Sequence, residues 1–393
     1  MSESSQRWRQ LALLGTVQLL GMSVWFAATA VAPVLRERLL LSPSESAWLT
    51  SAVQLGFVLG TLIAALLNLA DILPMRWYVA GAAVLAAFAN LALIPATSFA
   101  FAFAGRALTG LALAGVYPPA MKMAATWFRS GRGLAIGCVV GALNIGKAIP
   151  YLLEGSGHLP IGAVVWTTSG AAAFGAALIA LFYRDGPHAF VPRPFAWSLA
   201  LDVAREPELR RITGGYLGHM WELYAFWAWL PAFLGAAFVA GGDGSGAGIW
   251  PFVCVAVGAV GAVGGGLMAD RIGRIPVVRI ALVLSGACCL ASALAFGAPR
   301  GVLIAICVLW GIAAVADSAQ FSAMITERAP AHAVGTALTL QTSLGFLLTV
   351  ASIQLVPLLA ARIGWQWALV VLTFGPMAGL WSVQGIRRRD ERR

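Results

Sequence analysis

The sequence predicts an all-α integral membrane protein with twelve transmembrane helices, arranged as two pseudo-symmetric six-helix bundles. Three observations lead to this fold class: a shortage of charge, a series of long apolar runs, and an uneven distribution of Lys and Arg. Of the 393 residues, 60% are hydrophobic and only 11% are charged, whereas soluble globular proteins carry about 25% charged residues. This composition excludes a disordered chain and argues against a soluble enzyme.

Each apolar run is long enough to cross a bilayer as a helix, which takes about 20 residues. The runs do not alternate between polar and apolar residues as barrel strands do, so we expect helices. In chain order, the twelve runs cover residues 10–32, 45–69, 76–95, 98–126, 132–154, 159–182, 211–239, 247–268, 276–297, 300–322, 332–359 and 363–385.

The basic residues predict the orientation of the chain, because Lys and Arg accumulate on the cytoplasmic side of a membrane. If the N-terminus is inside, the inside segments carry 20 of the 26 basic residues, and two more, Arg106 and Lys147, lie within spans. The outside segments carry the other four, which are Arg36, Arg38, Arg300 and Arg362. We therefore expect both termini in the cytoplasm and the protein in the bacterial inner membrane. The net charge of +10 then reflects topology, and nucleic acid is not an expected partner.

The domain organisation follows from the longest segment outside the predicted spans, residues 184–210, which is rich in proline and charge. It separates an N-terminal six-helix bundle, 1–183, from a C-terminal one, 211–393, and acts as a cytoplasmic central loop. The halves correspond at an offset of about 200 residues, at which Asp71 matches Asp270. Two such repeats around a central site are the architecture of many secondary transporters.

Residues 266–274, Gly-Leu-Met-Ala-Asp-Arg-Ile-Gly-Arg, resemble the signature loop of the major facilitator superfamily. In the first half, Asp71 is a remnant of the same pattern without its glycines, and the fourth span, with Arg106, Gly110 and Gly115, is also similar to that family. The resemblance covers nearly the whole chain. It implies a small-molecule transporter in which spans 1, 4, 7 and 10 line a central cavity and the two halves rock around it.

The signature loop also has a physical interpretation, because charges at the cytoplasmic mouth can hold the two halves together in one state and release them in another. We therefore expect a gating role for Gly266, Asp270, Arg271, Gly273, Arg274 and Asp71. The alternative is a basic loop that only sets orientation.

Two other stretches, residues 127–133 and 218–224, resemble bacterial porters grouped with nitrate/nitrite and cyanate carriers. True nitrate porters carry paired arginines in the second and eighth spans, and neither 45–69 nor 247–268 contains an Arg. Nitrate itself is therefore not the expected substrate.

Ionisable groups within the membrane cost about 2.5–3.5 kcal/mol on insertion scales, so each needs a partner, water or a function. Glu222 lies near the middle of the seventh span, and His219 precedes it by three residues on the same helix face. A desolvated carboxylic acid can carry a proton, so we expect the pair to couple protons to transport or to contact substrate. The alternative is a structural hydrogen bond from Glu222 to a neighbouring helix. Two ligands do not make a metal site, so no metal is expected.

Other polar groups within the spans are candidate site residues. Lys147, with Asn144 on its face, would attract an anion, or alternatively pair with Glu154. Arg106 would bind a carboxylate or oxyanion bidentately, or tether backbone carbonyls. Asp317 is either a second proton site or the structural partner of a cation.

In the first span, Gln18 and Trp25 share a face that either forms the floor of a substrate cavity or packs in the core. A glycine-rich stretch in the fifth span, residues 141–148, resembles a phosphate-binding loop. It lacks the Ser or Thr that binds magnesium and lies within an apolar run, so no nucleotide site is expected.

These observations predict a secondary active transporter that works by alternating access, needs no cofactor and is not an enzyme. Its expected substrate is a small anion, either an organic acid or an inorganic oxyanion, with proton coupling as a further hypothesis. We expect a functional monomer in the lipid bilayer. The main alternative is a proton-driven exporter of hydrophobic or cationic compounds, which Glu222 and Asp317 would serve equally well. A nutrient sensor and a membrane-embedded enzyme are further alternatives; the scattered histidines do not favour the enzyme.

Overall fold

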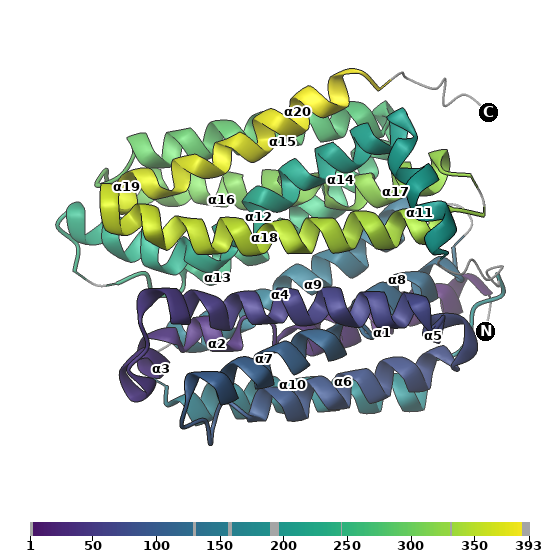
Figure 1. Cartoon of the computed structure of the whole chain (residues 1–393), viewed down its shortest axis with the longest axis horizontal. Coiled ribbons are helices and arrows are strands. Elements are labelled where there is room, and N and C mark those ends of the chain that lie inside the picture. The colour runs from purple at the N-terminus through teal and green to yellow at the C-terminus, as the bar shows by residue number, and fades with distance from the viewer. Residues whose placement is uncertain are drawn as a thin grey trace.

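The protein is described here by a computed structural model that covers residues 3–128, 131–155, 159–188, 196–244, 246–330 and 332–386. Every regular element in these residues is a helix. Helices from the N-terminal half of the chain gather on one side and those from the C-terminal half on the other, and α4 and α9 lie on the side of the N-terminal half that faces the C-terminal one (Figure 1). Helix α1 begins and helix α20 ends at the same end of the molecule (Figure 1).

The N-terminal half contributes six long helical segments. They are α1 (Glu3–Met22), α4 (Pro43–Leu66), α6 (Met75–Leu91), α7 (Phe99–Leu113) continued by α8 (Tyr117–Ala125), α9 (Arg132–Gly155) and α10 (Ile161–Phe182). Short helices connect them: α2 (Ala27–Ala30), α3 (Ala32–Leu39) and α5 (Leu69–Ile72).

The C-terminal half repeats this organisation. Its helices are α12 (Pro207–Ala240), α13 (Trp250–Ala256) continued by α14 (Gly258–Ile272), α15 (Arg274–Leu294), α16 (Arg300–Ala316) continued by α17 (Ser318–Arg328), and α18 (Val334–Ile363). The last segment consists of α19 (Trp365–Ala368), a 3₁₀ turn (Leu369–Thr373) and α20 (Phe374–Gln384).

The predicted all-helical membrane fold is confirmed. Within the described residues, ten helical segments are long and apolar enough to cross a membrane. The other two predicted spans, the first and the third, correspond to α1 and α6. The count of twelve spans is therefore compatible with the structure. Several arginines used in the charge count, namely Arg129, Arg193 and those from residue 387 onward, lie outside the described residues.

Two expectations need correction. The central segment 184–210 was expected to be a loop, but it contains a helix, α11 (Trp197–Arg205), anchored where Thr336 Oγ1 accepts a hydrogen bond from the Ala196 amide at 3.0 Å. The first span was expected to be continuous, but it breaks between Met22 and Ala27. Both features depend on contacts with residues far away in the sequence.

The two halves pack closely where α9 lies against α13 and α14, and where α4 lies against α18. Glycines permit the close approach of α9: a Cβ added at Gly137 would lie 2.9 Å from the carbonyl oxygen of Ala262. Near the other end of the helix, a Cβ at Gly155 would lie 2.3 Å from the carbonyl oxygen of Gly248. The interface is therefore tightly packed at both of these positions along α9.

Candidate functional site

The side chain of Lys147 lies at the interface between the halves and is 1% exposed. Its Nζ donates a hydrogen bond to the hydroxyl of Tyr224 on α12. The same nitrogen lies 3.9 Å from the ring centroid of Trp25, 4.4 Å from that of Tyr224 and 5.3 Å from that of Trp227. We call these four residues the lysine cage; its aromatic faces attract a cation electrostatically.

More aromatic rings surround the lysine cage and come from both halves of the chain. They are Phe26, Phe57, Tyr151 and Phe346. The rings of Phe57 on α4 and Phe346 on α18 are 4.4 Å apart between centroids, and each lies within 6 Å of the Trp25 ring, at 5.3 and 5.7 Å. The Tyr151 hydroxyl donates to the Trp227 carbonyl at 3.0 Å, which joins α9 to α12. The lysine cage is thus held by both halves.

No carboxylate pairs with Lys147 in the part of the chain that the structure describes; its polar contact is the Tyr224 hydroxyl. The predicted alternative, neutralisation by Glu154, is not what the contacts of Lys147 show. Burying an ion without a partner costs several kcal/mol. The aromatic faces offset part of that cost.

Several hydrogen-bond donors near the lysine are buried without an acceptor among the described residues. They are the indole Nε1 atoms of Trp25 and Trp227, the Nδ2 of Asn144 and the amide of Gln18. Gln18 lies on α1, where the backbone of the next residue, Leu19, packs against Gly146 of α9. A buried donor without an acceptor is destabilising, so this set marks a place suited to a ligand that brings acceptors.

Two further buried amides without partners, Gln54 on α4 and Gln341 on α18, were not selected from the sequence. Both lie in helices that meet across the interface. Both could have been selected from the sequence, because they are polar residues within apolar runs and a buried amide needs a partner as a charge does.

The contacts of Arg106 match the tether alternative. Its guanidinium donates to the main-chain carbonyls of Val24, at 3.0 Å, and of Trp25, and to the Asn90 side-chain oxygen at 2.9 Å. The Asn90 amide in turn donates to Thr168 and Ser169 on α10. Arg106 therefore donates to main-chain carbonyls at the break in the first span. Because one of them belongs to Trp25, Arg106 also fixes the main chain of a residue of the lysine cage.

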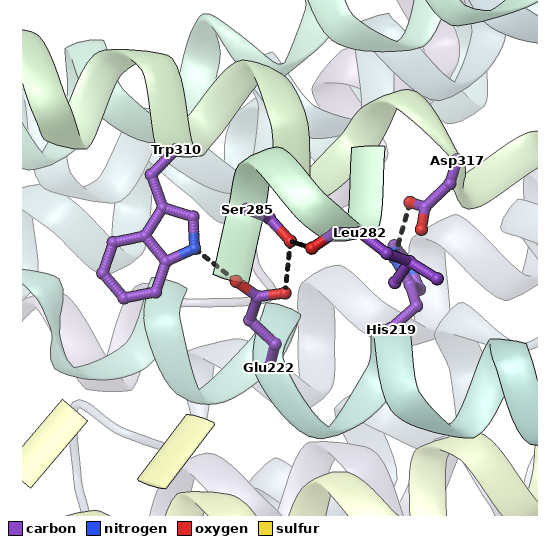
Figure 2. A network of polar contacts seen from close by, with 6 residues as sticks. All are labelled: His219, Glu222, Leu282, Ser285, Trp310 and Asp317. Atoms are coloured by element: carbon purple, nitrogen blue, oxygen red, sulfur yellow. Dashed lines mark hydrogen bonds and ion pairs between the residues drawn. The ribbon is translucent and has the colours of Figure 1, made fainter. Parts of the chain in front are cut away.

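Glu222 and His219 project from the same helix, α12, but bond to different partners (Figure 2). Trp310 Nε1 donates to one Glu222 oxygen at 2.5 Å, and Ser285 Oγ donates to the other at 2.9 Å. His219 Nδ1 lies 2.8 Å from Asp317 Oδ1, and both side chains are buried. All of these partners belong to the C-terminal half, so neither acid faces Lys147 directly.

Two of the predicted gating residues, Asp270 and Gly266, lie where the halves meet at one end. Asp270 places its carboxylate against Gly133 at the start of α9, where a Cβ would lie 2.9 Å from Oδ1. A carboxylate at a helix N-terminus is favoured by the helix dipole. Gly266 also packs on Gly133, because its Cβ position is 2.8 Å from the Gly133 carbonyl oxygen. These contacts join the two halves directly.

The rest of the loop bonds within its own half. Arg274 donates to Glu327 at 2.8 Å and to Gln320 at 2.9 Å. In the N-terminal half, Asp71 accepts a hydrogen bond from Lys122. The equivalent loops therefore use opposite charges: the loop residue is the acid Asp71 in the first half and the base Arg274 in the second. Gly273 has φ +87°, a conformation that glycine adopts without strain, and Arg271 is exposed.

Comparison with solved structures shows which proteins share this fold. The human organic anion transporter MFSD10 (TETRAN) matches with a TM-score of 0.75 and 16% identity, over 96% of this chain and 99% of that one. The nucleoside transporter NupG, in its D323A mutant, matches with a TM-score of 0.69 and 14% identity, over 96% of this chain and 100% of that one. At such identities, the likeness concerns the fold alone.

Sequence comparisons address the family. No curated protein matches the chain. The grouping with nitrate/nitrite and cyanate porters stays a prediction. The family model described as Major Facilitator Superfamily matches residues 13–353, which is most of the chain. Together with the shared fold, this match shows that the chain belongs to the major facilitator superfamily and is a multi-pass membrane transporter, not an enzyme.

Proposed function

We propose that this transporter moves a small anion, either an organic acid or an inorganic oxyanion, by alternating access between its two halves. The observation that carries the proposal is the buried side chain of Lys147, which no described carboxylate contacts. It lies at the interface of the halves, among donors without acceptors. An anion would supply both the missing charge and the missing acceptors.

The same contacts argue against the main alternative, an exporter of cationic compounds. Two buried acids would attract a cation, and both face partners inside the C-terminal half: Glu222 accepts hydrogen bonds from Ser285 and Trp310, and Asp317 lies 2.8 Å from His219 Nδ1. The charge at the interface is instead positive, and like charges repel strongly in a medium of low dielectric constant.

Proton coupling is the second element of the proposal. His219, Glu222 and Tyr224 lie within about one and a half turns of α12, and Tyr224 contacts Lys147. A movement of this part of α12 that follows protonation of His219 or Glu222 would therefore also move Tyr224. Protonation of Glu222 or of the His219–Asp317 pair would change the bonds that hold α12 against α15 to α17. A shift of α12 would then move Tyr224 relative to Lys147.

Alternating access requires that the interface close at one end while it opens at the other. We propose that the predicted bundles, 1–183 and 211–393, move as units, and that Asp270 and Gly266 hold the cytoplasmic end closed through Gly133. Sidedness follows the charge distribution, with both termini in the cytoplasm of a bacterium and the protein functioning as a monomer in the inner membrane.

The test is uptake into proteoliposomes, together with ligand-induced thermal stabilisation of the purified protein, over a panel of anions and cations. Lys147→Met is expected to abolish both signals for the transported anion, and an imposed pH gradient is expected to drive uptake by the unchanged protein. Arg362→Gln, at an exposed position near the end of α18, is the matched control. Binding of cations, or anion transport that survives Lys147→Met, would overturn the proposal.

A further inference from the structure

We infer that the substrate bound at the lysine cage is an organic monoanion with a flat apolar body, such as an aromatic monocarboxylate, and not an inorganic oxyanion. This inference rests on the proposed function, because it assumes that Lys147 binds the transported anion. Three features of the site lead to it: the number of available charges, the excess of donors and the chemistry of the walls.

The available charge favours a single negative charge on the ligand. Lys147 is buried and bonds to a neutral hydroxyl. Arg106, the other membrane cation, already donates to two carbonyls and an amide oxygen from a position behind the Trp25 backbone. Because an uncompensated buried charge is costly, one free ammonium matches one carboxylate better than a multiply charged anion.

The donors around the ammonium match the two oxygens of a carboxylate. The indole Nε1 atoms of Trp25 and Trp227 and the Nδ2 of Asn144 are buried without acceptors. Each of these residues either touches the ammonium with its ring or lies one helical turn from Lys147 on α9. A carboxylate can accept several hydrogen bonds at once and would satisfy these donors and Lys147 together.

The walls decide between the two kinds of anion. Trp25, Phe57, Tyr224 and Phe346 form a continuous set of rings, with centroids 4.4 to 5.7 Å apart. Aromatic faces carry partial negative charge, so they disfavour a bare oxyanion, whereas they stack well on another flat apolar group. The rings come from both halves, so a flat ligand body would contact both sides of the interface.

The inference explains why a positive charge and so many rings occupy one site. In the structure, the Nζ of Lys147 lies over the rings of Trp25, Tyr224 and Trp227. A carboxylate would draw the ammonium away from the rings, and the apolar body of the same ligand would take over the ring faces. An inorganic oxyanion would do only the first of these and leave the aromatic surface uncovered.

The test uses the full-length purified protein and a matched set of probes. Benzoate and phenylacetate represent the proposed class, acetate lacks the ring, nitrate and phosphate are inorganic, benzamide lacks the charge and benzylamine reverses it. Thermal stabilisation and competition for uptake are measured for each. We expect benzoate or phenylacetate to bind at least tenfold more tightly than acetate, nitrate, phosphate or benzamide, and Lys147→Met to abolish that binding.

Two variants distinguish the contribution of the charge from that of the rings: Lys147→Met removes the charge, and Phe346→Leu removes one aromatic ring. Phe346→Leu is expected to weaken benzoate binding several-fold and to leave acetate unchanged, which a general loss of folding would not do. If nitrate or phosphate binds through Lys147 while the aromatic carboxylates do not, or if no probe binds, the inference is overturned; in the first case the proposed function is retained. If benzylamine binds, or benzoate binding survives Lys147→Met, both are overturned.

Discussion

The guanidinium of Arg106 donates to the main-chain carbonyl of Trp25, at the point where the first transmembrane segment breaks. On its other side, the ring of Trp25 covers the ammonium of Lys147 at 3.9 Å. Trp25 therefore contacts both cations: Arg106 through its carbonyl, and Lys147, which we propose binds the substrate, through its ring. The break in the helix exposes carbonyls to Arg106, and the tether keeps Trp25 in place.

This relationship predicts that Arg106→Gln weakens both stability and binding. The change would remove the Arg106 donor from the Trp25 carbonyl, at a cost of about 1–3 kcal/mol for an unsatisfied group, and would leave the Val24 carbonyl with only the Ala27 amide as donor. We expect a clear drop in the melting temperature in detergent, and weaker anion binding because Trp25 is no longer fixed. Arg362→Gln should change neither. A variant with unchanged stability would contradict the tether.

The buried acid on α12 predicts a loss of coupling without a loss of folding. In Glu222→Gln, the remaining amide oxygen can still accept a hydrogen bond from Trp310 or Ser285, so we expect the protein to fold. Because the amide cannot exchange a proton, a pH gradient should no longer drive accumulation in proteoliposomes, whereas exchange of labelled for unlabelled substrate should continue.

Ser285→Ala is the matched control for Glu222, since it removes one hydrogen bond and leaves the carboxyl group in place. We expect this variant to keep uptake driven by the pH gradient. If Glu222→Gln keeps it as well, Glu222 has only a structural role and the coupling would have to reside in His219 and Asp317.

The spans and several single residues could be predicted from the sequence because hydrophobic length and membrane charge are local properties. Lys147 and Glu222 stand out on these grounds alone, whereas Trp25 is selected because it shares a helix face with Gln18. Their neighbours do not, because the meeting of Trp25, Lys147 and Tyr224 depends on how three helices pack. For the same reason, His219 and Glu222 share a helix face but bond to different helices, which no spacing along the chain reveals.

The contact between Asp270 and Gly133 predicts a defect in transport that spares binding. Asp270→Asn would remove the negative charge from the N-terminus of α9, an interaction worth about 0.3–1 kcal/mol near a helix end. We expect uptake to fall by several-fold, because the closed end is less stable, while thermal stabilisation by the substrate is retained. Asp202→Asn, in α11, is a control at an exposed carboxylate. Loss of binding in Asp270→Asn would argue against a purely gating role.

The opposite end of the interface gives a steric test of alternating access. At Gly155, even a Cβ would lie 2.3 Å from the carbonyl oxygen of Gly248, so Gly155→Val forces α9 away from the start of α13. Because the obstacle is backbone, it cannot move aside as a flexible side chain would. We expect this end to stay open, so that a cysteine placed at Ser51, which bonds to Gln354 across the halves at 3.0 Å, becomes accessible to a water-soluble thiol reagent. Transport should fall sharply, because a transporter held open at one end cannot complete its cycle.

Gly162→Val is the matched control, since the nearest atom to its Cβ is 4.0 Å away, on Trp166 of the same helix. Unchanged transport in Gly155→Val would mean that closure at this end is not part of the cycle.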